Sequence, residues 1–256
     1  MTRRILNLQL IALSLAIGAA LVVTRAQTPA PNTLTSDDRA AGWRLLFDGK
    51  TIDQWRGFRQ QSVPPGWQVV DGAITRVAGG PDLVSVEEFG SFEFRFDWMV
   101  APGGNSGIMF RVTETEAATY HTGPEYQVLD NARHADGKSP LTSAAACYGL
   151  HPPSKDVSRP AGSWNEGRLV VAGNRVEHWL NGERTVAYEI GSADWNARVA
   201  ASKFNEWKQF GKAARGRLAI QEHGDRVAFR NLKTKPTSGV GFPVVGSRKP
   251  TPEVVR

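Results

Sequence analysis

Aromatic and charged side chains alternate along residues 91–100, and this alternation constrains the fold more than any other feature of the chain. The aromatic positions are Phe92, Phe94, Phe96 and Trp98, and the positions between them are Glu93, Arg95 and Asp97. Because successive side chains of a strand point to opposite faces, the segment predicts a β-strand with one aromatic face. Such a face needs a second layer to cover it, so we expect two packed sheets.

Shorter alternating runs recur along most of the chain. They lie at residues 43–47, 67–70, 73–77, 107–112, 125–129, 168–171, 175–180, 185–190, 217–221 and 226–232. Asn181-Gly182 and Asp71-Gly72 separate such runs and favour tight hairpin turns, because these residues tolerate positive φ. Residues 193–212 depart from alternation and predict a long loop or short helix packed over the sheet. Without a long helical period, the chain is expected to be all-β, a sandwich or a barrel.

The two ends of the chain differ from this β pattern. Residues 1–26 begin with two arginines, Arg3 and Arg4, continue with an apolar run and end in small residues after Arg25, which is typical of a secretory signal peptide; an uncleaved membrane anchor is the alternative. Residues 27–42 are expected to form a linker with one helical turn capped by Ser36, and residues 236–256 a disordered tail. Residues 43–235 are then one domain, in a protein that is periplasmic or secreted.

Charge and cysteine content narrow the possible partners. The net charge falls from +6 for the whole chain to +3 once the signal is removed, so we expect no nucleic-acid partner. We also expect no membrane association after cleavage, and the sequence does not predict an oligomeric state. Cys147 is the only cysteine, which rules out an intrachain disulfide and favours a small buried residue.

Polar side chains gather on the outward faces of three predicted strands. They are Glu125 and Gln127 in residues 125–129, Asn105 and Arg111 in residues 104–113, and Gln221 and His223 in residues 217–224. Within residues 104–113, Ile108, Phe110 and Val112 take the opposite parity and are expected on the core side. The pattern predicts a polar cleft on one face of a sheet.

The carboxylate in this set is compared first with known glycosidases. Retaining sandwich glycosidases place two carboxylates about 5–5.5 Å apart. Here the partner of Glu125 is Gln127, and an amide cannot serve as an ionised nucleophile. A surface ion pair between Glu125 and Arg111 fits the strand pattern equally well. His223 fits both a general acid or base and a histidine bonded to its turn.

The sequence gives little support for a metal site or for a catalytic serine. The other histidines, at 121, 134, 151 and 178, show no ligand spacing, so no metal site is predicted. An oxygen-rich ion site around Glu125 or Asp130 stays open. The chain has no Gly-x-Ser-x-Gly motif, and Asn105-Ser106-Gly107 indicates a strand entry where glycine permits the close approach of another chain or a ligand.

Several of these motifs occur together in an order that resembles one family. They are Leu46–Trp55, Gly104–Ile108 with Arg111, Gly123–Gln127 with Asp130–Asn131, Trp164–Asn165, Glu177–Gly182, Ser202–Phe204 and Gln221–Gly224 with Phe229–Asn231. On these motifs residues 43–235 resemble the 3-keto-disaccharide hydrolase family. The resemblance implies a concanavalin A-like jelly-roll sandwich of two antiparallel sheets, in a protein usually exported by bacteria.

The resemblance also implies a reaction in which a ketone at C3 of the sugar acidifies the proton on C2. A base removes that proton, the enolate expels the C1 aglycone, and water adds back. Glu125 or His223 is expected to be the base and the other the acid, with Arg111 and Lys203 at the enolate oxygen. The expected substrate-binding residues are Asn105, Gln127, Asp130, Tyr148, His178 and Gln221. No cofactor is implied, and a divalent cation stays open.

Two other functions fit the same fold. The sandwich often serves as a lectin, so a carbohydrate-binding module without turnover is one alternative. An ordinary retaining glycosidase is the other. In all three readings the partner is a carbohydrate.

Overall fold

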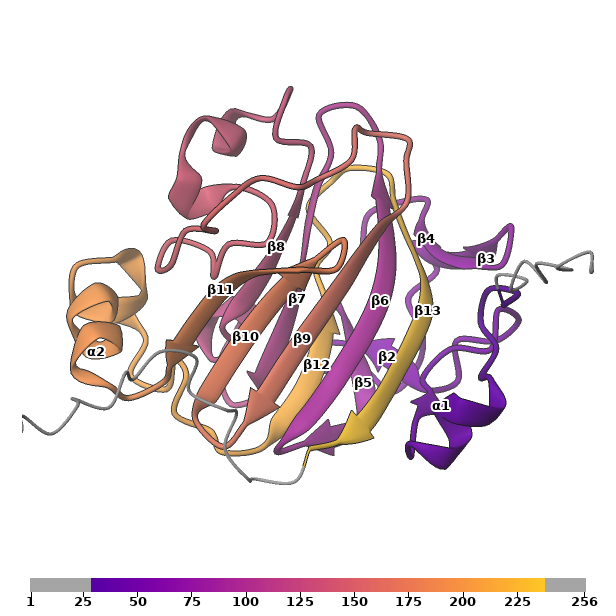
Figure 1. Cartoon of the computed structure of the whole chain (residues 1–256), viewed down its shortest axis with the longest axis horizontal. Coiled ribbons are helices and arrows are strands. Elements are labelled where there is room, and N and C mark those ends of the chain that lie inside the picture. The colour runs from indigo at the N-terminus through magenta and orange to yellow at the C-terminus, as the bar shows by residue number, and fades with distance from the viewer. Residues whose placement is uncertain (1–28, 238–256) are drawn as a thin grey trace, which may run out of the picture.

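The computed structural model describes residues 29–237. Two antiparallel sheets pack face to face (Figure 1). The larger sheet has the order β11 (Glu183–Glu189), β10 (Arg175–Leu180), β9 (Asn165–Ala172), β6 (Phe92–Val100), β13 (Val227–Pro236), β4 (Ala73–Arg76) and β3 (Trp67–Val70), and β1 (Arg44–Leu45) pairs with β13. The smaller sheet has the order β2 (Trp55–Gly57), β5 (Leu83–Phe89), β12 (Gly216–Ile220), β7 (Asn105–Val112) and β8 (Glu125–Leu129). The predicted all-β sandwich is confirmed.

The aromatic face of β6 lies in the core, as the alternation predicts. Phe92, Phe94, Phe96 and Trp98 are all at most 2% exposed. The Phe96 ring meets Tyr126 of β8 edge to face, with ring centroids 5.2 Å apart. Because β6 and β8 belong to different sheets, this contact joins the two layers, and burial of rings this large contributes several kcal/mol of hydrophobic stabilisation, roughly 1.5–3 kcal/mol for each side chain.

Each of the eleven predicted runs contains a strand. The two predicted hairpin turns are present too, with φ of 50° and 85° at Asn181 and Gly182 and of 51° and 71° at Asp71 and Gly72. Two strands were missed. β2 has three residues, and β5 alternates poorly, because Glu87 and Glu88 interrupt its apolar pattern.

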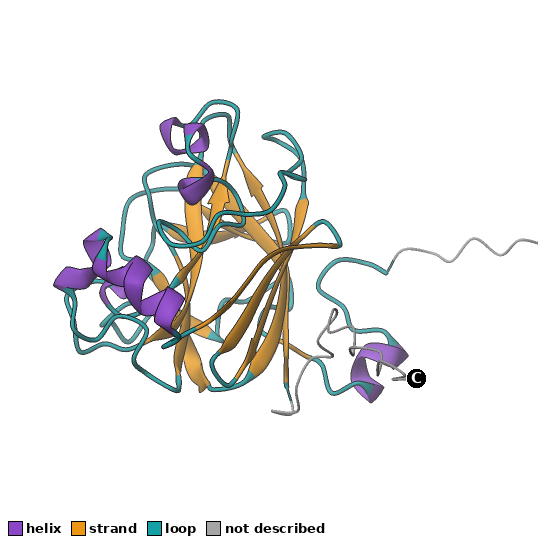
Figure 2. Ribbon diagram, turned by 60° about the vertical axis from the view of Figure 1, so that its left-hand side comes forward, coloured by secondary structure: helices purple, strands orange, loops and turns teal. Residues whose placement is uncertain are grey.

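Short helical segments lie outside the sheets, as Figure 2 shows. They are α1 (Ser36–Ala40), η1 (Thr119–His121), η2 (Ala135–Lys138), η3 (Pro140–Thr142), α2 (Ala193–Ala200) and η4 (Lys203–Glu206). The cap of α1 is Thr35 rather than Ser36, because Thr35 and Asp38 form a reciprocal capping box. The predicted packing of residues 193–212 over the sandwich is confirmed by the burial of Trp195, Phe204 and Phe210.

A bulge in β7 overturns the predicted direction of Arg111. Val112 pairs with Arg217 and Met109 with Ala219, so β7 has one residue more than β12 between these pairs. Arg111 lies in this stretch with φ of 57°, in the left-handed region. An extra residue reverses the parity beyond it. Arg111 therefore turns toward the larger sheet, and Val112 turns to the outer face, where it packs with Met109.

The chain ends lie largely outside the described residues. The predicted signal peptide, residues 1–26, falls in the undescribed part, as do residues 238–256 of the predicted tail. Pro236, where the tail was expected to begin, is the last residue of β13, and the Thr237 hydroxyl donates to the Val171 carbonyl at 2.8 Å. Within residues 29–237, no helix has the length and apolar character needed to cross a bilayer.

Candidate functional site

A cavity of about 290 Å³ opens on the outer face of the smaller sheet. Strands β7, β8 and β12 form its floor, and η1, η4 and the loops after β8 and β12 form its walls. The lining residues are Asp82, Asn105, Tyr120, Glu125, Gln127, Tyr148, Lys203, Phe204, Gln221, Glu222 and His223. The size is at the lower end of ligand pockets, which hold roughly 300–1,000 Å³.

Glu125 lies at the floor of this pocket, and only 7% of the residue is exposed. Strand β8 directs its side chain across Gly107 of β7, where a Cβ atom would be only 1.9 Å from Oε1. No hydrogen bond or ion pair reaches the carboxyl group from residues 29–237. Burial raises the pKa of Glu125 to about 8, against the influence of Lys203, which lowers it, and with smaller increases from Asp82 and Asp136.

Lys203 provides the positive charge of the pocket. Its Nζ lies over the rings of Tyr148, Phe204 and Tyr120, at 4.7, 5.4 and 5.8 Å from the ring centroids. Cation–π contacts of this kind hold an ammonium group without neutralising it. No ion pair within residues 29–237 involves Lys203, and its positive charge lowers the pKa of Glu125 against the increase that burial causes.

Two amide side chains that line the pocket carry buried oxygen atoms without a partner among the described residues. Gln127 donates from Nε2 to the Thr142 carbonyl at 3.1 Å, which fixes its Oε1 as an acceptor. Within the described residues, Oε1 of Gln127 and Oδ1 of Asn105 have no hydrogen-bond partner, although the two residues are 0% and 2% exposed. Because buried polar atoms are normally paired, these oxygens are suited to hydroxyl donors of a ligand.

The loop after β12 brings Gln221 and His223 to the same pocket. Gln221 is held at the end of the strand, since its N–H donates to the Gly107 carbonyl at 2.9 Å and its carbonyl accepts from Ser106 Oγ at 2.8 Å. His223 is exposed at the rim, and its Nε2 lies 3.5 Å from Nδ2 of Asn105. Together with Tyr148 and Lys203, these placements put seven of the ten predicted site residues around one cavity.

Two further acids of the pocket carry structural partners. Asp82 accepts hydrogen bonds from the Thr119 hydroxyl and from the Glu222 N–H. Glu222 forms an ion pair with Arg76 at 2.7 Å and accepts from the Gly224 N–H. The strand pattern missed Asp82 and Tyr120 as lining residues, because both lie between strands, and only the fold brings them to the cavity.

Three predicted site residues do not line this cavity. The first is Arg111, which the β7 bulge turns away. Its guanidinium donates to the Gly173 carbonyl at 2.6 Å and to Asn174 Oδ1 at 3.3 Å, in the β9–β10 turn of the larger sheet. Neither an ion pair with Glu125 nor contact with a ligand in the pocket is consistent with that position.

His178 is the second, because β10 belongs to the opposite sheet and directs this side chain into the space between the layers. Its Nδ1 lies 3.0 Å from the Ala145 carbonyl, its Nε2 lies 3.1 Å from the Tyr188 hydroxyl, and the residue is 0% exposed. Burial lowers the pKa of His178 to about 4. The buried neutral ring connects β10 to the turn at Ala145 through the contact between Nδ1 and the Ala145 carbonyl.

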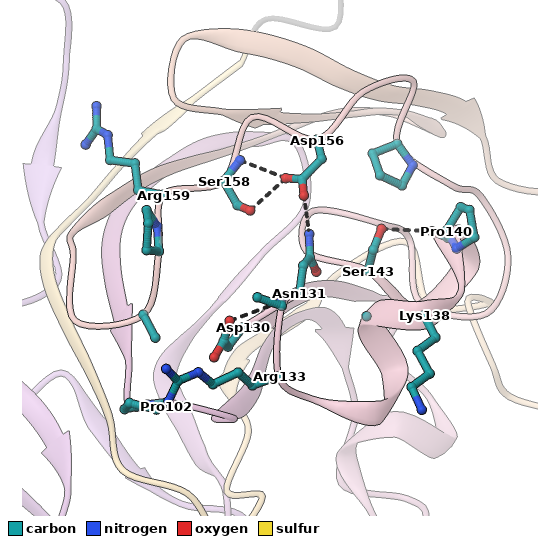
Figure 3. A pocket seen from close by; sticks show the side chains of 15 residues that line it. Pro102, Asp130, Asn131, Arg133, Lys138, Pro140, Ser143, Asp156, Ser158 and Arg159 are labelled. Atoms are coloured by element: carbon teal, nitrogen blue, oxygen red, sulfur yellow. Dashed lines mark hydrogen bonds between the residues drawn. The ribbon is translucent and has the colours of Figure 1, made fainter.

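Asp130 is the third, and it lines a separate hollow of about 770 Å³ (Figure 3). It follows the last residue of β8, and its carboxylate accepts from the N–H groups of Gly103 and Ala132 at 2.8 and 3.1 Å. The alternation that places Glu125 and Gln127 on the outer face ends before Asp130.

Cys147 is buried as predicted. Burial raises the pKa of its thiol to about 12, which disfavours a thiolate.

Comparison with known proteins shows the family to which the chain belongs. Residues 42–235 match the model of the 3-keto-α-glucoside-1,2-lyase-like domain. The chain belongs to this family. A 3-keto-disaccharide hydrolase of Bacteroides thetaiotaomicron is 32% identical over 228 residues, which are 77% of this chain and 79% of that protein. Membership of the family identifies the protein as an enzyme.

Two solved structures are similar to this one. A structure from Parabacteroides distasonis, described provisionally as a glycosyl hydrolase, is 33% identical and superposes with a TM-score of 0.77 over 82% of this chain and all of that chain. A second structure from the same organism has a TM-score of 0.59 at 21% identity, over 76% of this chain and 99% of that chain, and supports the fold alone. The jelly-roll architecture implied by the sequence resemblance is confirmed.

Proposed function

We propose that the protein hydrolyses 3-keto-glycosides or 3-keto-disaccharides by proton abstraction at C2, elimination of the C1 aglycone and hydration. The observation that carries this proposal is the burial of the Glu125 carboxyl group without a partner. It is a buried carboxyl group, without a hydrogen-bond or ion-pair partner from residues 29–237, inside a cavity that also holds a cation. An unpartnered buried carboxyl group is costly to the fold, and such groups are retained where they do chemistry.

Glu125 is assigned as the base. The ionised carboxylate removes the proton from C2, and the electron pair left behind forms an enolate with the C3 ketone. The enolate then expels the C1 oxygen, which takes the proton back from Glu125, so that the aglycone leaves as an alcohol. Water adds to C1 of the unsaturated ketone and a proton returns to C2, which gives the free 3-keto sugar. A pKa near neutrality suits a group that both accepts and donates a proton.

Lys203 is assigned to the negative charge that develops on the substrate. Because Arg111 faces the larger sheet, Lys203 is the cation of the predicted pair that remains in the pocket. A preorganised cation aimed at a developing oxyanion lowers the barrier most in a site with little water. Gln127, Asn105, Gln221 and Tyr148 are assigned to the sugar hydroxyls, on the strength of the two unpartnered amide oxygens.

Direct displacement at the anomeric carbon is less well supported. A retaining glycosidase needs an ionised nucleophile beside the acid. The position two residues after Glu125 is the amide Gln127, and the carboxylates of Asp82 and Glu222 already accept hydrogen bonds from backbone N–H groups.

We also propose that the protein is exported, because residues 1–26 have the composition of a signal peptide.

The test compares two substrates with one protein. The purified chain without residues 1–26 is incubated with a 3-keto-glycoside and with its unoxidised parent, and release of the aglycone is measured. The proposal expects release from the ketone alone, and expects Glu125→Gln to reduce it by about 10²–10⁴-fold. Cleavage of the parent at a comparable rate would establish displacement instead, and binding of the ketone without release would establish a binding protein.

A further inference from the structure

Two histidines and an aspartate meet beside the Glu125 pocket, and the proposed steps leave them without a joint role. His134 caps η2, whereas His223 and Asp225 follow β12. The ligand atoms of the three side chains lie within 4.8 Å of one another. The sequence predicted no metal site because the histidines are scattered along the chain, but the fold brings two of them together.

A fourth side chain is directed into this cluster. Nδ2 of Asn105 lies 3.5 Å from Nε2 of His134 and 3.5 Å from Nε2 of His223, and the backbone N–H of Asn105 donates to Asp225 at 3.1 Å. The Oδ1 atom of Asn105 is buried and has no partner among the described residues. A half-turn of the amide brings that oxygen toward the three ligand atoms. In that orientation the oxygen, which has no partner in the present one, would bind an ion at the cluster, and the amide nitrogen would face the sugar-binding pocket.

We propose that this cluster is a binding site for one divalent transition-metal ion. Its ligands are the imidazoles of His134 and His223, the carboxylate of Asp225 and the side-chain oxygen of Asn105. Imidazole ligands favour zinc, cobalt, nickel or iron over calcium and magnesium, which prefer sites made of oxygen atoms.

Binding changes one hydrogen bond of the loop. Nδ1 of His134 accepts from the Asp136 N–H at 3.1 Å. A neutral imidazole that ligates through Nε2 carries its proton on Nδ1. Because a protonated Nδ1 cannot accept a hydrogen bond, the bond from the Asp136 N–H is lost when the ion binds. The cost is a single hydrogen bond at the start of a short 3₁₀ turn, which leaves the strands unchanged.

The site deepens the proposed function and rests on it for its chemical role. Asn105 and His223 both line the pocket of Glu125, so the ion lies at the wall of that pocket. A 3-keto-glycoside presents a ketone oxygen flanked by hydroxyl groups, and an α-hydroxyketone of this kind binds a divalent ion through two oxygens. As a Lewis acid, the ion would polarise the ketone and make the C2 proton more acidic. It would act from the rim, with Lys203 acting from η4.

The binding test uses the intact protein and the metal alone. After treatment with a chelator and removal of the chelator, the protein is titrated calorimetrically with Zn²⁺ and with Co²⁺. The proposal expects one ion per chain, and a loss of affinity of more than about tenfold in His223→Ala and in Asp225→Asn. His121→Ala is the matched control, because His121 stacks on Trp207 outside the cluster, and it keeps the affinity of the unaltered protein. Absence of binding, or equal affinity in all variants, overturns the proposal.

A second measurement separates this site from the proposed reaction. Turnover of a 3-keto-glycoside is followed in the chelated protein and after the ion is restored. The proposal expects at least a tenfold recovery in the unaltered protein and none in Asp225→Asn. If the ion binds but the ketone is not cleaved, the proposed function fails and the metal site stands. If the ketone is cleaved at full rate by protein that binds no ion, the metal site fails and the function stands.

Discussion

Glu125 lies so close to Gly107 that a single methyl group at Gly107 would be 1.9 Å from Oε1. The contact joins β8 to β7 at the floor of the pocket. Glycine at this position is therefore required by the carboxyl group and not by a turn, since Gly107 is within a strand. The sequence predicts that this glycine permits the close approach of another chain or a ligand, whereas the group that approaches it is the side chain of the assigned base, Glu125.

Gly107→Ala tests this relationship. The added methyl displaces the Glu125 carboxyl, and a shift of about 1 Å in a catalytic group costs about 10²-fold in rate. We expect kcat/KM on a 3-keto-glycoside to fall by that amount while the protein stays folded. Gly79→Ala is the control, because a Cβ there meets no atom within 4 Å, and it keeps full activity. Equal activity in the two variants would show that the position of Glu125 does not matter for turnover.

Glu125 also links stability to pH. Its pKa rises from 4.5 in the unfolded chain to about 8 in the fold, so between these values the folded state holds a proton that the unfolded state has lost. The free energy of unfolding therefore falls as pH rises from 4.5 to 8. Glu125→Gln removes this loss, and we expect its stability relative to the unaltered protein to increase by about 4 kcal/mol between pH 4.5 and 8. Urea unfolding at both pH values measures it, and a pH-independent difference contradicts the assigned pKa.

The pH dependence of turnover reports the same group. Because the base must be ionised, kcat/KM should rise with pH through a midpoint near 8. Lys203 lowers the pKa of Glu125, whereas Asp82 and Asp136 raise it. Lys203→Met should therefore move the midpoint to higher pH as well as lower the rate. Lys212→Met, at an exposed lysine outside the pocket, leaves the midpoint in place. A midpoint that is the same in both variants would exclude Lys203 from the surroundings of the base.

Arg111 provides the contrast to Lys203. Its guanidinium is bonded to Gly173 and Asn174 of the larger sheet, so Arg111→Met should keep kcat/KM per folded molecule within about threefold. The fraction of folded protein is measured by thermal unfolding at the assay temperature. A loss as large as that of Lys203→Met would place Arg111 at the enolate after all.

Strand parity made part of the site predictable. Glu125, Gln127 and Gln221 lie in or directly beside regular strands, and the period of two placed all of them on the outer face. The same rule failed at Arg111, where one extra residue and a left-handed φ reverse the parity, and no residue type in β7 announces that bulge.

The other differences have topological causes. The parity of His178 in β10 is regular, but the outward or inward direction depends on which sheet holds the strand, and pairing over long sequence distances decides this. Asp82 and Tyr120 lie between strands, where alternation carries no information. The meeting of His134 with His223 depends on two loops 89 positions apart in the chain, and local spacing cannot reveal it.

The proposed reaction removes the proton from C2 of the sugar during turnover, and hydrolysis in D₂O reveals whether that proton is lost. The released 3-keto sugar is examined for deuterium at C2 by NMR or mass spectrometry at early times. A sample of the protonated product, incubated in D₂O with the enzyme and without it, corrects for later exchange. We expect one deuterium at C2 for each molecule of 3-keto sugar released. Product released with its original C2 proton would contradict elimination and require direct displacement at C1.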